Sequence, residues 1–472
     1  MEKPATVRYR SDLERARGRS RRSRLITFAF LFIAALVGLA FWRVGPVPEL
    51  GIELDVPGIG PSTTVVGVAR EPQRGLSAVR LELVQGSRSW VLAEEEHDPR
   101  PFWAFWGAMA AETRLEETVL GAGLEGLEEG DVLVRLTAER APTWFRRPAP
   151  QVVEQRVEAR LRPPSVDLGP TPVRVRQGGS GVVSYRVGET AVASGVRAGE
   201  AFYPGYPVPG GGPRDRFAIF AVPYDEDSDA SLRLQVRDAL GNELEARFIT
   251  NFTPKPLKSS QIRLNERFLD KVVGEIVSRT PGLSAAGSPL ETYLRINGDL
   301  RRANAVELVE LAGRSAPEML WSQPFRQQPN SQLMDDFAAR RTYLYEGRKV
   351  DTQDHLGFDL ASVRRAPVAA SNRGRVVLSR YLGIYGNTVV LDHGYGVQSL
   401  YSHLSAIEVE EGDLVERGQS LGRSGETGLA GGDHLHFSIM VGGSPVDPLE
   451  WFDGRWIETR LLSAVPSLPY EG

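Results

Sequence analysis

The sequence predicts a mainly β protein of several domains with a single N-terminal transmembrane helix. Its 472 residues are enough for about three domains, since one domain typically takes about 100–200 residues. Short alternating runs of apolar and polar residues recur from about residue 50 to residue 255, which is typical of antiparallel strands. One uncharged apolar run near the N-terminus is long enough for a membrane helix. The hydrophobic content of 41% and the charged content of 25% exclude global disorder.

The membrane helix is predicted at residues 25–42, which read LITFAFLFIAALVGLAFW without a charge. As an α-helix these residues span about 27 Å, close to the hydrocarbon thickness of a bilayer. Residues 1–24 form a basic tail, so the positive-inside rule places this tail in the cytoplasm and the rest of the chain outside. We interpret the run as an uncleaved signal anchor that contacts membrane lipid, because it is long and ends in Phe41-Trp42. A cleaved signal peptide is the alternative.

Charge and cysteine content exclude several classes of function. The net charge of −4 divides into +6 for the basic tail and −10 for residues 25–472. An acidic main body argues against nucleic acid as a partner of the whole chain. The chain has no cysteine, which excludes disulfides, zinc–thiolate sites, iron–sulfur clusters and cysteine nucleophiles. A metal site in this chain must therefore use His, Asp and Glu.

Two β-sandwich modules are expected at residues 50–162 and 163–255, with a boundary at Pro163-Pro164. Alternating runs such as VRLELV and LRLQV end at turn-forming residues, as half-buried antiparallel strands do. The modules resemble immunoglobulin-like domains, although no motif carries the resemblance. His97 lies in the acidic run EEEHD, which we interpret as a solvated charged turn rather than a ligand cluster.

A helical connector is predicted at residues 256–322. Apolar residues recur at helical spacing from Leu264 to Val277, and Thr280-Pro281-Gly282 ends the run. A second helix is expected at residues 304–312. A packed connector is the favoured interpretation, and a regulatory segment that covers the active site is the alternative.

Histidines cluster in the C-terminal part, with five of the six between residues 355 and 436. His434 and His436 share one face of the predicted strand HLHFSIMV, and His355 and Asp359 share a face with Gly357 between them. His355, Asp359 and one of His434 or His436 thus make a set of two nitrogens and one oxygen. Such a set leaves a fourth position for water, as in catalytic zinc sites, where the pKa of that water falls to near 7. The remaining histidines can act as general base or stabilise an oxyanion.

Residues 323–456 resemble the LytM/lysostaphin-like family of zinc metallopeptidases, which cut peptidoglycan cross-bridges or stem peptides. Three segments carry the resemblance: His355 and Asp359 as HxxxD, Tyr401-Ser402-His403-Leu404, and a Gly/Ser/Thr-rich run that leads into His434-Leu435-His436-Phe437. The resemblance implies that His355, Asp359 and His436 bind one Zn²⁺ per chain. It also implies that His403 and His434 are catalytic histidines that do not bind the metal.

The rest of this domain is expected to be an antiparallel β fold of duplicated-hairpin type. Residues 367–377 read as strand, turn and strand, and residues 409–421 repeat this pattern. We interpret His393 as structural, and we interpret Arg340-Arg341 as a surface pair rather than a contact for a substrate carboxylate. Residues 457–472 are expected to form a C-terminal tail.

Together these features predict a membrane-anchored zinc metalloendopeptidase whose catalytic domain lies in the periplasm and hydrolyses peptide cross-links of peptidoglycan. D-alanyl–diaminopimelate bonds are the expected target, by analogy, and glycine bridges are the alternative. The competing hypothesis is a catalytically inactive LytM-like module that binds the wall and activates another hydrolase. All five site residues are present, which favours the enzyme. The β modules are candidate contacts for cell-division or wall-synthesis proteins.

Overall fold

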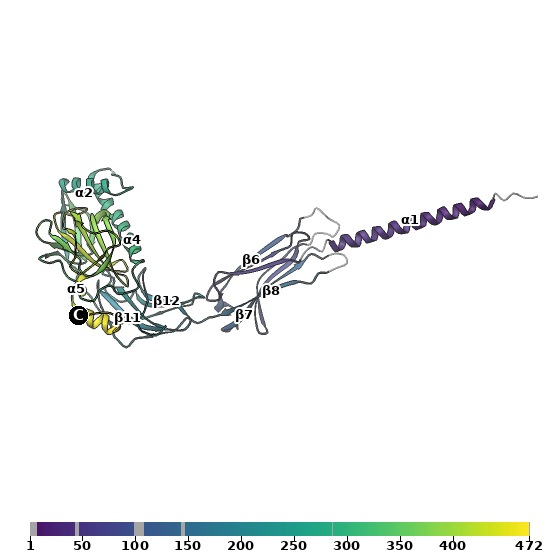
Figure 1. Ribbon diagram of the computed structural model, residues 1–472, viewed down its shortest axis with the longest axis horizontal. Coiled ribbons are helices and arrows are strands. Elements are labelled where there is room, and N and C mark those ends of the chain that lie inside the picture. Colours follow the sequence, from purple (N-terminus) through teal and green to yellow (C-terminus); the bar gives the residue numbers. More distant parts are fainter. Residues whose placement is uncertain (1–6, 43–46, 99–107, 143–146, 286, 472) are drawn as a thin grey trace, which may run out of the picture. The chain divides into compact units, whose positions relative to one another are not determined.

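The structure, a computed structural model, describes residues 7–42, 47–98, 108–142, 147–285 and 287–471. It confirms the mainly β class, with 45% of residues in strands and 18% in helices. The chain divides into two compact units, Met1–Arg162 with Ala239–Asn242 and Pro163–Asp238 with Glu243–Gly472. Figure 1 colours the elements of both units along the chain, and each unit is described by itself below.

The N-terminal apolar run lies in helix α1 (Val7–Trp42). Within this helix the window Arg22–Leu39 has a mean hydropathy of 1.7, so by length and composition it could cross a membrane. Its large apolar side chains are exposed, for example Leu25 at 69% and Phe30 at 71%. The helix begins before the predicted span because Arg, Leu, Glu and Ala in the basic segment are good helix formers.

The first unit also contains two sheets that share one hydrophobic core. The sheet orders are β1-β3-β6 and β2-β8-β7-β4-β5. The strands are β1 (Glu49–Leu54), β2 (Gly58–Ile59), β3 (Thr63–Arg70), β4 (Leu76–Gln85), β5 (Arg88–Glu96), β6 (Glu112–Val119), β7 (Gly130–Arg140) and β8 (Gln151–Ala159). Alternate residues of β3, β4 and β7 point into the core, among them Val65, Leu81 and Val134. This alternation is what the sequence pattern predicts for a sandwich with one solvated face on each sheet.

The second unit begins with strands that form two four-stranded sheets, β14-β15-β11-β9 and β13-β12-β16-β17, and a parallel pair, β10 with β18. The strands are β9 (Val166–Leu168), β10 (Val173–Arg176), β11 (Ser180–Val187), β12 (Ala191–Ala198), β13 (Ala201–Pro204), β14 (Tyr206–Pro207), β15 (Asp215–Ala221), β16 (Leu232–Asp238), β17 (Glu243–Ala246) and β18 (Ile249–Thr253).

The C-terminal part of this unit is built on an eight-stranded sheet of order β20-β23-β31-β27-β26-β25-β29, with β32 paired to β31. Its strands are β20 (Gln332–Asp335), β23 (Phe358–Ala361), β25 (Gly374–Tyr381), β26 (Asn387–Gly394), β27 (Val397–Leu404), β29 (Leu414–Val415), β31 (Leu435–Val441) and β32 (Ser444–Val446). A smaller sheet has the order β24-β30-β28, with β24 (Pro367–Ala369), β28 (Ala406–Ile407) and β30 (Ser420–Arg423). Residues after β32 form the short helices α5 (Pro448–Phe452) and α6 (Gly454–Trp456) and the π-helical turn η4 (Ile457–Leu462).

The strands of residues 163–255 and the C-terminal sheet share one hydrophobic core. The Tyr395 ring packs edge-on against Phe217 and Tyr206, with ring centroids 5.0 Å and 4.9 Å away. Polar contacts join the same two parts, because Lys255 Nζ lies 2.7 Å from Asp447 Oδ2 in a buried ion pair. These two parts of the second unit are therefore one folded body.

The segment 256–322 holds a strand as well as the predicted helices. Strand β19 (Ser259–Leu264) pairs in parallel with β21 (Ala339–Tyr345), which pairs with β22 (Arg348–His355). Helices α2 (Glu266–Arg279), α3 (Pro289–Arg295) and α4 (Arg301–Ala312) follow, with the π-helical turn η2 (Ile296–Leu300) between the last two. Figure 1 shows α2 and α4 beside the C-terminal sheet, and Leu308 of α4 packs against Leu378 and Met440 of that sheet. Helix α3 was not predicted from the sequence. It begins with a capping box of Ser288 and Glu291.

Candidate functional site

Strand register brings the predicted site residues together. In the antiparallel pairing of β23 with β31, Asp359 lies directly opposite His436. In the pairing of β27 with β31, Ser402 lies opposite His436, so that His403 follows one residue later. His355 ends β22, three residues before β23 begins. Residues that are far apart in sequence, and that come from two different sheets, therefore lie close together.

Three donor atoms form a nearly equilateral triangle. His355 Nε2, Asp359 Oδ1 and His436 Nδ1 are each 3.0 Å from the other two. All three residues are buried or half-buried, and among the described residues they form the group of His and Asp side chains able to hold a metal ion. Zinc bonds to nitrogen and oxygen are about 2.0–2.2 Å long, so one ion can reach all three atoms and keep a position open. The donor set therefore fits Zn²⁺.

In His355 and His436, the ring nitrogen outside the donor triangle forms a hydrogen bond that leaves the other nitrogen unprotonated and able to bind a metal. His355 Nδ1 lies 3.1 Å from the carbonyl oxygen of Asp336, which can only accept, so the proton sits on Nδ1 and leaves Nε2 free. Ser438 donates to the carbonyl of Leu356 at 2.8 Å and accepts from His436 Nε2 at 3.1 Å, which leaves Nδ1 free. Such outer contacts fix the tautomer and orientation of metal-ligating histidines.

Burial and charge set the protonation states of the donor residues. Burial opposes ionisation of Asp359, but its close polar contacts with His355, His434 and His436 hold the pKa of this carboxyl well below its usual range. Burial lowers the pKa of His436 to about 4, more than the Asp359 carboxylate raises it. A neutral imidazole and an ionised carboxylate are the forms that bind metal.

His403 and His434 lie beside the donor triangle and outside it. Their ring centroids are 4.9 Å apart, and that of His403 lies 5.8 Å from that of His436. His403 Nδ1 donates to the carbonyl of Thr427 at 2.7 Å, and His434 Nδ1 donates to that of Gly432 at 2.8 Å. Each Nε2 is thus left for other chemistry, and that of His434 lies 3.4 Å from Asp359 Oδ1.

The two outer histidines differ in their tendency to hold a proton. Burial, with the nearby His434 and His436, lowers the pKa of His403 well below its usual value. Burial also acts against a proton on His434, but the hydrogen bond and charge of Asp359 outweigh it and raise the pKa. His403 also has a left-handed backbone, with φ of 62°, which costs a non-glycine residue about 1–3 kcal/mol. Such strain is typical of functional positions.

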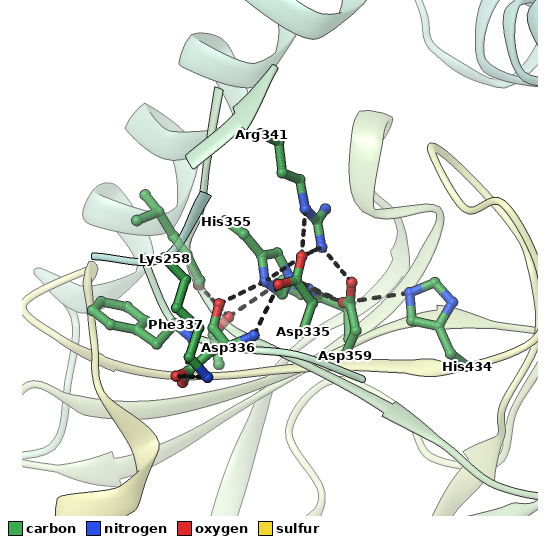
Figure 2. A network of polar contacts seen from close by, with 11 residues as sticks. Lys258, Asp335, Asp336, Phe337, Arg341, His355, Asp359 and His434 are labelled. Carbon is green, nitrogen blue, oxygen red and sulfur yellow. Dashed lines mark hydrogen bonds and ion pairs between the residues drawn. The ribbon is translucent and has the colours of Figure 1, made fainter. Parts of the chain in front are cut away.

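Arg341 lies in the candidate site, although it was predicted to belong to a surface pair. Figure 2 shows Asp359 between Arg341 on one side and His434 on the other. The Arg341 guanidinium donates to Asp359 Oδ2 and lies equally close to Asp335 Oδ2, at 2.6 Å from each, and its side chain is 19% exposed. The surface-pair interpretation holds for Arg340, which is 54% exposed and pairs with Asp354. It is wrong for Arg341, because the pairing of β21 with β22 turns alternate residues inward.

The two remaining histidines lie outside the cluster. His393 is fully buried and bonded to the Arg373 carbonyl and the Ser399 hydroxyl, both at 2.7 Å, as expected of a structural residue. His97 is not in a solvated turn, because it follows β5 with 18% of its side chain exposed. Its Nε2 lies 2.7 Å from Thr113 Oγ1.

The donor triangle lies in an open cleft of about 970 Å³. His355, Asp359, His403, His434 and His436 all line it, and so does Arg341. One wall comes from the C-terminal sheet and its loops, and the other from β19, α2 and α4. A cleft of this size is large enough for several residues of an extended peptide.

A triangle of candidate metal donors beside two further imidazoles in an open cleft fits the class of metal-dependent hydrolases. Residues 353–448 match the family model described as peptidase family M23, and the chain carries a domain of this family.

Similar proteins each cover part of the chain. The chain is 30% identical over 181 residues to the peptidoglycan DD-endopeptidase ShyA of Vibrio cholerae. This alignment covers 38% of this chain and 39% of that protein. It is 41% identical over 95 residues to the DD-carboxypeptidase/endopeptidase Mpg of Neisseria meningitidis. This alignment covers 20% of this chain and 22% of that protein. The chain thus spans less than half the length of these curated relatives. A crystal structure of a putative M23 peptidase from Pseudomonas aeruginosa is 24% identical, covering 60% of this chain and 94% of that one, with a TM-score of 0.36.

Proposed function

We propose that this protein is a zinc metalloendopeptidase that hydrolyses peptide cross-links of peptidoglycan. The observation that carries the proposal is the triangle of His355, Asp359 and His436 donor atoms, 3.0 Å apart, within a domain of peptidase family M23. Two relatives named as peptidoglycan DD-endopeptidases support the substrate class. D-alanyl–diaminopimelate bonds are the proposed target.

The residues of this chain divide the chemistry between them. When bound by His355, Asp359 and His436, zinc would lower the pKa of a water molecule and polarise the scissile carbonyl. His403 has an unprotonated Nε2 and a pKa lowered by burial, which suits it to accept a proton from the attacking water. His434 holds a proton more readily, which suits it to donate a hydrogen bond to the oxygen that becomes negative.

Arg341 supports the same site by orienting one donor. Because Asp359 Oδ2 is occupied by the guanidinium, only Oδ1 faces the two histidine nitrogens. A carboxylate held in this way binds a metal through one oxygen. That leaves coordination positions for water and for the substrate carbonyl.

We further propose that residues 25–42 anchor the protein in the cytoplasmic membrane and that the catalytic cleft lies on the outer side. The apolar window of α1 and the basic residues before it support this orientation. A peptidase with a wall substrate needs its cleft outside the cytoplasm, which agrees with that arrangement.

The test uses the full chain in detergent, loaded with zinc and incubated with isolated peptidoglycan sacculi. The expected result is release of muropeptides with new D-alanine ends, loss of the reaction with a chelator, and recovery with added zinc. The His403→Ala variant is the matched inactive control. Binding to sacculi without chelator-sensitive cleavage would overturn the proposal and favour the inactive, hydrolase-activating module instead. Cleavage of glycine-bridged wall alone would overturn the proposed bond.

A further inference from the structure

One wall of the catalytic cleft comes from residues outside the family match at 353–448. Arg263 of β19, Arg267 and Lys271 of α2, and Arg301 and Arg302 of α4 line the same cleft as the histidine cluster. The family match does not account for these five cationic side chains, and the proposed chemistry does not use them.

This wall is fixed to the loop that precedes His434. Glu275 of α2 accepts a hydrogen bond from the backbone nitrogen of Gly428 at 2.9 Å, and its carboxylate also lies 3.3 Å from the Tyr381 hydroxyl. Lys271 pairs with Glu426 at 2.9 Å. Strand β19 pairs with β21, the strand that carries Arg341. The elements β19 and α2, which carry three of these cations, are therefore held at a set position relative to the donor triangle.

Three of the five cations have no acidic partner among the described residues. Lys271 is neutralised by Glu426 and Arg302 by Asp299. Across the ranges that the structure describes, Arg263, Arg267 and Arg301 form no ion pair. Arg301 is half-buried and donates through Nε and Nη2 to Asn297, at 3.2 Å and 2.6 Å, which leaves Nη1 without a bond among those residues.

The acidic side chains of the cleft are already engaged. Asp354 pairs with Arg340, and Asp359 is bonded to Arg341 and the histidines. A bound zinc ion would add two more positive charges close by. The free surface of the cleft is therefore strongly cationic, which favours an anionic ligand. The planar fork of arginine matches a carboxylate through paired hydrogen bonds.

We propose that Arg263, Arg267 and Arg301 form a carboxylate-binding subsite, so that the peptidase selects peptides with free carboxylates close to the scissile bond. This inference rests on the proposed peptidase function and adds the charge of the substrate to it. Peptides in which the same carboxylates are amidated lose the partner of these arginines and bind more weakly.

The experiment compares two cross-linked peptides of one sequence, with free or amidated carboxylates, as substrates of the zinc-loaded full chain. We expect kcat/KM to be at least about tenfold higher for the free acid, mainly through KM, and the advantage to shrink at high salt. The double variant Arg263→Gln/Arg267→Gln and the triple variant that adds Arg301→Gln should lose this preference. Their rates on the amidated peptide should match the wild type.

The matched control is Arg295→Gln with Arg314→Gln, which removes exposed charges of the same helical segment that do not line the cleft. This control should keep the preference. The double variant changes two exposed side chains, so it tests the subsite even where the triple variant does not fold. Equal cleavage of both peptides by the wild type, or an unchanged preference in the double variant, would overturn the subsite.

A separate binding measurement distinguishes this inference from the proposed function. If the wild type cleaves neither peptide, the peptidase proposal fails, and calorimetric titration of the metal-free chain still tests the subsite. Binding that is tenfold tighter for the free acid supports the subsite, and equal binding overturns it. If inorganic phosphate competes with both peptides and neither peptide binds more tightly, the arginines form a general anion site. That result would also overturn the carboxylate-binding subsite.

Discussion

The Arg341 guanidinium lies 2.6 Å from Asp359 Oδ2, while Asp359 Oδ1 lies 3.0 Å from both His355 Nε2 and His436 Nδ1. The two oxygens of one carboxylate thus have separate partners. Asp335 accepts from the same guanidinium, so the arginine is itself held from two sides. We therefore expect the metal affinity to depend on Arg341, a residue that does not itself bind a metal.

Replacing Arg341 by alanine should weaken zinc binding by about 10- to 100-fold, the usual effect of removing an outer partner of a metal ligand. The adjacent Arg340→Ala is the control, because its exposed pair with Asp354 should matter little. Competition with a chromophoric chelator measures both affinities. Equal affinities in the two variants would show that Arg341 does not position Asp359.

The two histidine roles can be separated by metal content. His436→Ala should lose both bound zinc and activity, since it removes one corner of the donor triangle. His403→Ala should keep one zinc per chain and lose about 10²- to 10⁴-fold in kcat, the range expected of a general base. Metal analysis of the purified variants with a rate assay checks both. Loss of zinc from His403→Ala would contradict the assigned roles.

Gly357 should tolerate no side chain. A Cβ there would lie 2.4 Å from Ser438 Oγ and 2.7 Å from His436 Nε2, so Gly357→Ala must push the imidazole or its serine partner away. We expect weaker zinc binding with little change in overall secondary structure. Gly431→Ala is the matched control in the same cleft, where a Cβ would meet nothing within 4 Å. Zinc titration and circular dichroism of both variants provide the comparison.

Glu450 should make stability fall as pH rises. Burial, with a smaller effect of Asp447, raises the pKa of this carboxyl from 4.5 to about 8 in the folded chain. Between these two values the folded state holds a proton that unfolding releases, so the free energy of unfolding decreases with pH across that window. Glu450→Gln removes the effect and keeps an oxygen for the Ser180 backbone nitrogen, which bonds Glu450 at 2.6 Å.

The variant should therefore melt at a higher temperature than the wild type at pH 8 and at a similar temperature at pH 4. Thermal melts of both proteins in chelator, from pH 4 to pH 9, check this expectation. A melting difference that stays constant across the range would contradict a buried protonated carboxyl at this position.

Local spacing explains why much of the site was predictable. His355 and Asp359 are four residues apart and His434 and His436 two, so each pair stays close in space. Neither pair lies within one strand, because His355 ends β22 before β23 begins and His434 precedes β31. Spacing left open which of His434 and His436 joins the donor triangle. In the structure that depends on long-range register, because Asp359 pairs with His436 of β31 while His434 precedes this strand.

Other features follow from pairings that no local pattern reveals. Arg341 lies on β21, which pairs with β22, and its side chain reaches Asp335 of β20 and Asp359 of β23 in another sheet. The outer contact of His436 depends on Ser438 meeting the carbonyl of Leu356, which lies between β22 and β23. Helix α3 is a different case, because its capping box at Ser288 and Glu291 is visible in the sequence and predicts a helix start.

The shared core of the second unit limits how far the peptidase can be treated as a module. Tyr395 contacts Phe217 and Tyr206, and Trp451 donates its indole N–H to Ser180 at 3.0 Å. A graft of residues 353–448 onto another anchor would strip Tyr395 of its aromatic partners, leave out Trp451 and remove the arginine-bearing wall. Chimaeras and deletion series therefore need to move Pro163–Asp238 and Glu243–Gly472 together. The family match at residues 353–448 is thus shorter than the part of the chain that shares one hydrophobic core.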